Sequence, residues 1–188
     1  MIYAPMETLM TKRLVLRKLT MEDVPCFFGR LGGNERVTEH MLWVPHRHIS
    51  ESAASIDKVL ARYKTGCCYR WGITLCESNE LIGIIDLLGF EEARSACSFA
   101  YMLGEDFWGQ GYGTEAVQAV FDFAFDKMQI AVIEADHFAE NPASGTVMYK
   151  AGMKNIGMVP GKYEKDGVSH DAILYRITQK DWERRCGG

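Results

Sequence analysis

The stretch Trp108-Gly109-Gln110-Gly111-Tyr112-Gly113-Thr114 carries most of the information about the fold of this chain. It follows an apolar, β-prone segment, residues 97–103, and opens a segment over 113–128 whose apolar residues recur at helical spacing. Three alternate glycines let the backbone curl so that successive N–H groups point into one concavity, where a helix N-terminus adds partial positive charge. Such a turn can hold a diphosphate with main-chain groups alone.

Three other interpretations of this turn have to be weighed against a diphosphate site built from main-chain groups: a P-loop, a dinucleotide-binding turn and a simple helix cap. A P-loop is disfavoured because no Gly-Lys-Ser/Thr ends the segment. A dinucleotide-binding turn gains support from Asp136, which lies on the next predicted strand about where a ribose-binding acid would sit. However, the spacing here is G-x-G-x-G, which lacks the glycine that such a turn has three residues after its second glycine. A turn that merely caps a helix would not need three glycines in five residues. The anion site is therefore the favoured interpretation.

The remaining sequence predicts one α/β domain with a mixed sheet. Helices are expected after the Thr20/Asp23 capping box, after a cap at Ser50, over residues 113–128, and from Asn141-Pro142 to about Ala151. Strands are expected at residues 14–17, 69–75, 81–88, 97–103, 131–137 and 170–178. No linker or repeat divides the 188 residues, so a single domain over 1–188 is predicted.

Composition and charge argue against several function classes. A net charge of −4 gives no electrostatic reason to bind nucleic acid or an anionic membrane. Neither a secretion signal nor an apolar run of bilayer-spanning length is recognisable, and the six cysteines form no C-x-x-C pair, so reduced thiols and a cytoplasmic location are expected. His40, His46 and His48 lack a nearby acid or cysteine to complete a metal site, so no metal is expected.

Four segments in order resemble the GNAT acetyltransferases, specifically the RimJ/RimL-like branch that acetylates ribosomal-protein N-termini. The resemblance covers nearly the whole chain and implies the GNAT fold, an α/β (α+β) architecture with a mixed sheet of about six to seven strands flanked by about four helices. The segments that carry it are Thr11-Lys12-Arg13-Leu14-Val15-Leu16-Arg17, residues 99–103 with the turn 108–116, Asn141-Pro142-Ala143-Ser144 with Tyr149-Lys150-Ala151-Gly152-Met153, and Asp171, Tyr175 and Asp181-Trp182.

The resemblance implies an N-acetyltransferase that transfers the acetyl group of acetyl-CoA, its co-substrate, to a primary amine. The acceptor would be a protein N-terminal α-amine or a small-molecule amine, in a protein that is a monomer or a homodimer. Asn141 would bond the pantetheine amides and Lys150 would reach the phosphates. The strand before the turn would be splayed, so that its free backbone groups bond the pantetheine arm. These strand residues and the diphosphate donors would be Tyr101, Met102, Leu103, Gly109, Gln110, Gly111, Tyr112, Gly113 and Thr114.

The resemblance also suggests the acid and leaves the base open. Tyr149 is the expected proton donor to the leaving thiolate, and Ser144 could substitute through its hydroxyl. At the position where this branch often carries a glutamate on its central strand, this chain has Ser98. A serine side chain cannot act as a general base at neutral pH without help from another group. A water relay, or an amine that arrives already neutral, is an alternative. The candidate bases are Glu39, His40, Asp86, Glu134 and Asp136.

Two alternatives belong to other function classes. A non-catalytic acyl-CoA-binding regulatory domain would explain Ser98 as lost chemistry. A dinucleotide-binding oxidoreductase would require protection by NAD(H) and no effect of CoA. An acetyltransferase, by contrast, is stabilised by acetyl-CoA and releases CoA thiol when an acceptor is added.

Overall fold

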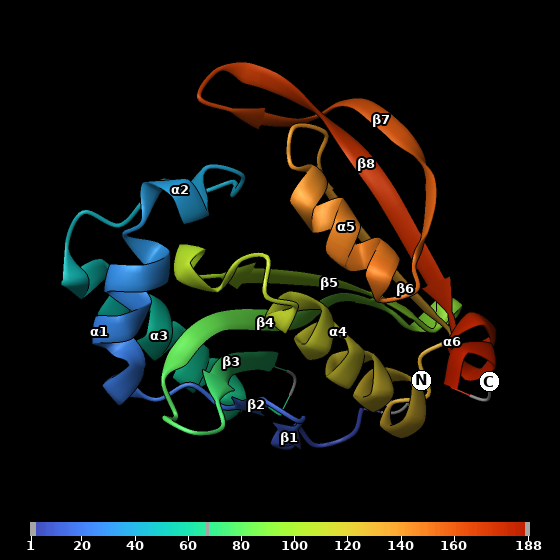
Figure 1. Cartoon of the computed structure of the whole chain (residues 1–188), viewed down its shortest axis with the longest axis horizontal. Coiled ribbons are helices and arrows are strands. Elements are labelled where there is room, and N and C mark those ends of the chain that lie inside the picture. Colours follow the sequence, from blue (N-terminus) through green and yellow to red (C-terminus); the bar gives the residue numbers. More distant parts are fainter. Residues whose placement is uncertain (1–2, 67, 187–188) are drawn as a thin grey trace.

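A computed structural model of the chain describes residues 3–66 and 68–186. The described residues form one eight-stranded sheet in the spatial order β1-β2-β3-β4-β5-β6-β8-β7 (Figure 1). Neighbouring strands are antiparallel except β5 and β6, which run parallel. The strands are β1 (Leu9–Met10), β2 (Leu14–Arg17), β3 (Tyr69–Leu75), β4 (Leu81–Glu91), β5 (Ala96–Leu103), β6 (Val132–Phe138), β7 (Lys154–Lys165) and β8 (Val168–Thr178).

Two of the described helical segments begin where the sequence predicted a cap. Thr20 and Asp23 form the expected capping box, and the Asn141 side chain accepts from the Ser144 N–H with Pro142 in the first helical turn. None of these helices is both long and apolar enough to span a membrane. They are α1 (Val24–Cys26), continued by a π-helical segment (Phe27–Gly32), α2 (Glu35–Thr38), α3 (Ile49–Tyr63), α4 (Tyr112–Asp122), continued by a π-helical segment (Phe123–Lys127), α5 (Pro142–Lys150) and α6 (Gln179–Cys186).

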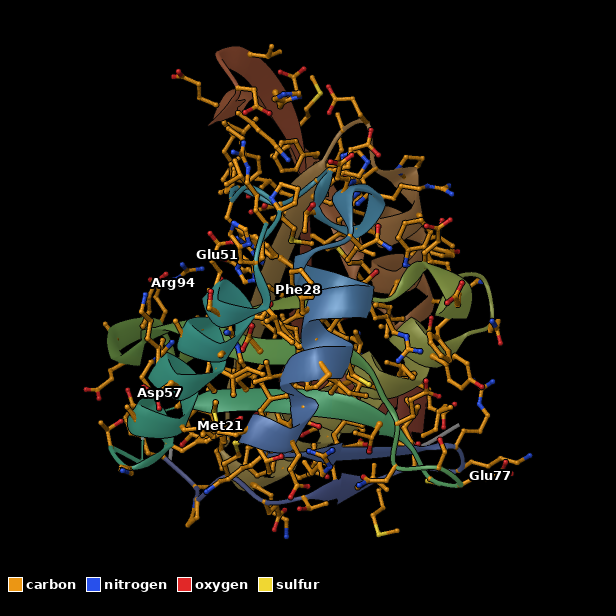
Figure 2. All side chains as sticks on the ribbon, turned by 90° about the vertical axis from the view of Figure 1, so that its left-hand side faces the viewer. Met21, Phe28, Glu51, Asp57, Glu77 and Arg94 are labelled. Carbon is orange, nitrogen blue, oxygen red and sulfur yellow. The ribbon has the colours of Figure 1, made fainter. Side chains whose placement is uncertain are left out.

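The sheet buries an apolar core on each of its faces. On one face α4 and its π-helical continuation pack over β2 to β6, with Phe121 and Trp182 of α6 in edge-to-face contact. On the other face the π-helical continuation of α1 and α3 bring together Phe27, Leu31 and Ile56; Figure 2 shows this side, with Glu51 and Asp57 labelled on α3. The two cores fix the sheet between helical layers, as expected for an α/β domain.

The described residues form the expected mixed α/β architecture, but the sheet has eight strands rather than about six to seven, and there are six α-helices in this part of the chain rather than about four. The missed strands are β1, which has two residues, and β7. Nearly every residue of β7 is exposed, and Pro160 lies within it, so its sequence carries no alternation between buried and exposed residues. Tertiary pairing with β8 makes it a strand despite that pattern.

Two local predictions need correction. The cap of α3 is His48 rather than Ser50, because the Glu51 carboxylate accepts from the His48 and Arg47 backbone N–H groups. Residues 154–165, where no strand was expected, form β7, and the turn of the β7–β8 hairpin follows them. Its turn residues Asp166 and Gly167 have φ of +52° and +75°, which is typical of a two-residue hairpin turn.

The cysteines were expected to be reduced thiols. Cys26, Cys68, Cys76 and Cys97 are free. Cys67 and the side chain of Cys186 lie outside the described part of the chain.

Candidate active site

The sheet opens in its middle, where β5 and β6 separate. The two strands are paired only over Ala96–Ser98 of β5 and Val132–Glu134 of β6. Residues 99–103 of β5 continue along β4 on one side and, among the described residues, have no strand partner on the other. Parallel strands that diverge in this way leave backbone N–H and C=O groups free to bond another molecule.

A cavity of about 440 Å³ lies at this opening. We name its two sides the turn wall and the α2 wall. The turn wall consists of Tyr101, Met102, Leu103, Phe107, Trp108, Gly109, Gly111, Gly113, Thr114, Asn141, Ala143, Ser144, Thr146, Val147 and Lys150. The α2 wall consists of Arg36, Val37, Glu39, His40 and Met41. The first group comes from β5, the connection to α4, the start of α4 and α5, and the second comes from α2 and the residues directly after it; Figure 1 shows α2 across from α5.

The turn wall gathers most of the predicted cofactor residues. Gln110 and Tyr112 belong to the turn but do not line the cavity. Gly109 and Gly111 have φ of +73° and +84°, in the left-handed region that favours glycine. Gly111 is the N-cap of α4, and within the described residues no side chain caps this helix, so the N–H groups of its first turn are available to an anion.

Two hydroxyl groups meet on the turn wall. Asn141 Nδ2 donates to Ser144 Oγ at 3.0 Å, and the Ser144 hydroxyl is also hydrogen-bonded to that of Tyr101. Burial raises the pKa of Tyr101 to about 12, so its hydroxyl keeps its proton at neutral pH. The result is a connected row of polar groups, from Asn141 through Ser144 to Tyr101, that can supply a proton to a bound molecule.

Tyr149 lies on another face of α5. Its side chain is 73% exposed and is not part of the cavity lining, whereas the adjacent Met148 is buried. Five residues separate it from Ser144, a rotation of about 140° around a helix with 3.6 residues per turn. The role of Tyr149 as proton donor stays a prediction, and Ser144 has the more direct access to the cavity.

The five candidate bases divide into two groups. Only Glu39 and His40 line the cavity. Asp86 is buried in a two-bond ion pair with Arg70, and burial raises its pKa. The other two carboxylates are also engaged elsewhere, Glu134 by Arg94 and Arg176, and Asp136 by Lys162 and Tyr163.

Ser98 also lies away from the cavity. It sits at the paired end of β5, opposite Leu88 on one side and Glu134 on the other. It is not part of the cavity lining. The serine at this position therefore has no direct bearing on which group takes the proton.

One residue that sequence reasoning missed holds the α2 wall in place. Lys165, at the tip of the β7–β8 hairpin, donates from Nζ to the backbone oxygens of Thr38 and Glu39 at 2.9 and 2.6 Å. These carbonyls end α2 immediately before His40, and a lysine satisfies the orphan acceptors of a helix C-terminus. No local signal could have revealed this contact, because about 126 residues separate the partners.

The chain matches known proteins over most of its length. The sequence model of the acetyltransferase (GNAT) domain matches residues 13–154. An uncharacterized N-acetyltransferase, p20 of Bacillus licheniformis, is 27% identical over 94% of this chain and 99% of its own length. The ribosomal protein uS5 alanine N-acetyltransferase of Escherichia coli is 25% identical over 95% of this chain and 94% of its own.

The fold is shared with solved structures. The RimL ribosomal L7/L12 α-N-protein acetyltransferase, solved in complex with coenzyme A, superposes with a TM-score of 0.81 at 21% identity. The superposition covers 92% of this chain and 98% of that one.

Proposed function

The chain belongs to the acetyltransferase (GNAT) family and is an acetyl-CoA-dependent N-acetyltransferase, and we propose that its acceptor is the α-amine of a protein or peptide N-terminus. The observation that carries this proposal is the single cavity that joins a glycine turn, a row of hydroxyls and His40. The similarity to an enzyme acting on a ribosomal-protein alanine extends along nearly the whole chain and supports the choice of acceptor.

A second hollow on the outer side of α2 supports an acceptor longer than one residue. It is lined in part by Glu35, Lys165 and His170, and it shares Arg36 and Glu39 with the main cavity. A peptide whose terminal amine lies in the cavity could therefore lay its following residues between α2 and the β7–β8 hairpin. A small amine would occupy the main cavity alone, and it is the second candidate acceptor.

In the proposed reaction the turn wall holds acetyl-CoA. Backbone N–H groups around residues 109–114 bind the diphosphate, and the free edge of β5 at Tyr101, Met102 and Leu103 bonds the pantetheine arm. Asn141 would bond that arm and Lys150 would reach the phosphates, since both line the cavity. This arrangement places the thioester near Ser144, where holding both reactants together supplies much of the rate enhancement.

The amine nitrogen attacks the thioester carbonyl, so that an N–C bond forms and the C–S bond breaks. We assign to the Ser144 hydroxyl the proton that the leaving sulfur receives; solvent returns a proton to Ser144, and the Tyr101 hydroxyl and the Asn141 amide hold its side chain in place. We assign the proton lost by the amine to His40, because imidazole is the commonest general base and this ring lines the α2 wall. Asn141 and Tyr101 act through Ser144 as positioning groups.

The test uses thermal unfolding and thiol release together. Acetyl-CoA at millimolar concentration should raise the melting temperature, since a ligand that binds only the folded state stabilises it. Peptides with a free α-amine should then release CoA thiol, and the same peptides with blocked termini should not. No shift with acetyl-CoA would defeat the proposal, whereas a shift without thiol release from any amine would identify a non-catalytic acyl-CoA-binding domain.

A further inference from the structure

Arg13 contacts the glycine turn from outside the cavity. Its Nη1 donates to the Gln110 backbone oxygen at 3.0 Å, and its guanidinium carbon lies 4.2 Å from the ring centroid of Tyr112. A Cβ built on Gly111 would stand 3.4 Å from Arg13 Nη2. One side chain thus contacts Gln110 and Tyr112 and approaches Gly111 between them, yet it does not line the cavity.

Glu115 holds Arg13 in this position. Arg13 donates to the carboxylate from Nε at 2.7 Å and from its backbone N–H at 2.9 Å, and Thr11 adds a bond from Oγ1 at 2.6 Å. Burial raises the pKa of Glu115, but the bonds from Thr11 and Arg13 outweigh it and the net pKa is lowered. The carboxylate is therefore charged at neutral pH, and this ion pair joins the β1–β2 connection to the first turns of α4.

The bond from Arg13 to the Gln110 carbonyl also fixes the direction of the next N–H group, that of Gly111. A trans peptide is planar, so its carbonyl and the following N–H point in opposite directions. Because the Gln110 oxygen points to Arg13, the N–H of Gly111 points away from Arg13, and Gly111 lines the cavity. With flexible glycines at 109 and 111, this peptide would otherwise rotate easily.

We propose that Arg13 and Glu115 form a clamp that keeps residues 110–112 in the conformation that presents N–H donors to the diphosphate of acetyl-CoA. Both are positioning residues that act through the turn rather than by touching the co-substrate. Donors held in place before binding avoid the entropy cost of ordering the loop. This inference rests on the proposed acetyltransferase activity.

The experiment compares two acetyl donors in Arg13→Met, Glu115→Gln and a control variant, Arg17→Met. Arg17 is the last residue of β2, the strand that begins directly after Arg13, and it forms a similar ion pair, with Asp23, away from the turn. We expect Arg13→Met and Glu115→Gln each to raise the KM for acetyl-CoA about tenfold with kcat little changed. The kcat/KM for S-acetylpantetheine, which ends before the diphosphate, should stay within about twofold of wild type, and Arg17→Met should leave both donors unaffected.

Several outcomes would overturn the clamp. If Glu115→Gln binds acetyl-CoA as well as wild type while Arg13→Met does not, Arg13 acts by its own charge on the diphosphate. An equal loss of kcat/KM with acetyl-CoA and with S-acetylpantetheine would mean that the variant affects the stability of the whole protein. The same conclusion would follow if Arg17→Met reproduced the loss. Failure of the wild-type protein to bind acetyl-CoA would instead defeat the proposed function, and it is seen before any variant is made.

Discussion

The turn wall and the α2 wall face the same cavity but are held in place differently. The turn wall continues directly from the larger core: Gly113 has the side chains of Leu103 and Val147 close by, and the neighbouring Met148 is buried in that core. The α2 wall rests on a four-residue helix, and the segment that follows it exposes Leu42 and Val44. A long-range bond from Lys165 ties the end of this helix to the hairpin.

This difference indicates how the enzyme separates its two recognition tasks. In the proposed site the co-substrate would meet backbone groups of the turn, which packing against the larger core and the Arg13–Glu115 ion pair hold in place. The proposed acceptor would meet side chains on and after a short helix that a distant hairpin contacts through Lys165. Local stability differs across a structure, and binding segments with few buried contacts belong to its less stable parts. Each variant below is therefore assayed twice, for the Kd of acetyl-CoA and for the kinetics of the acceptor.

The largest effect is expected at His40. His40→Gln should lower kcat by about 100-fold, because loss of a general base typically costs that much or more, and should leave the Kd of acetyl-CoA unchanged. Glu39→Gln, at the adjacent cavity-lining position, is the matched control, with a loss below about threefold. If the Kd of acetyl-CoA rises instead of kcat falling, His40 belongs functionally with the turn wall and the separation of tasks is wrong.

A smaller effect is expected at Ser144. Ser144→Ala should lower kcat about tenfold with acetyl-CoA binding nearly intact, since a thiolate leaves readily and an acid only assists it. Tyr149→Phe removes the other candidate donor from the same helix. We expect less than a twofold change for it, measured as initial rates at saturating acetyl-CoA. A larger loss in Tyr149→Phe than in Ser144→Ala would reverse the assignment of the acid.

The smallest effect is expected at Lys165. Lys165→Met should raise the acceptor KM about fivefold, which corresponds to the net value of one or two hydrogen bonds, without changing the Kd of acetyl-CoA. Lys162→Met, on the same hairpin but paired with Asp136, should change neither quantity. Equal effects of the two variants on the acceptor KM would show that the hairpin acts by charge rather than through its contact with α2.

Most of the fold and the turn wall could be predicted from sequence because their signals are local. The cap at Asn141, the glycines of the turn and the helical spacing of α4 each depend on residues close together in the chain. The β7–β8 hairpin was missed because its exposed strand lacks an alternating pattern, although Asp166-Gly167 was a usable turn signal.

The sequence alone indicated the family and the co-substrate through its resemblance to known acetyltransferases. It also located the glycine turn and the cap at Asn141, because glycines and caps act through the backbone within a few residues. Only the tertiary structure decided which polar groups reach the cavity. Ion pairs away from the cavity hold Asp86, Glu134 and Asp136. The cavity is instead lined by Glu39 and His40, and the Tyr149 side chain is exposed to solvent. Those choices depend on strand register, helix rotation and contacts across more than a hundred residues, such as those of Arg13 and Lys165.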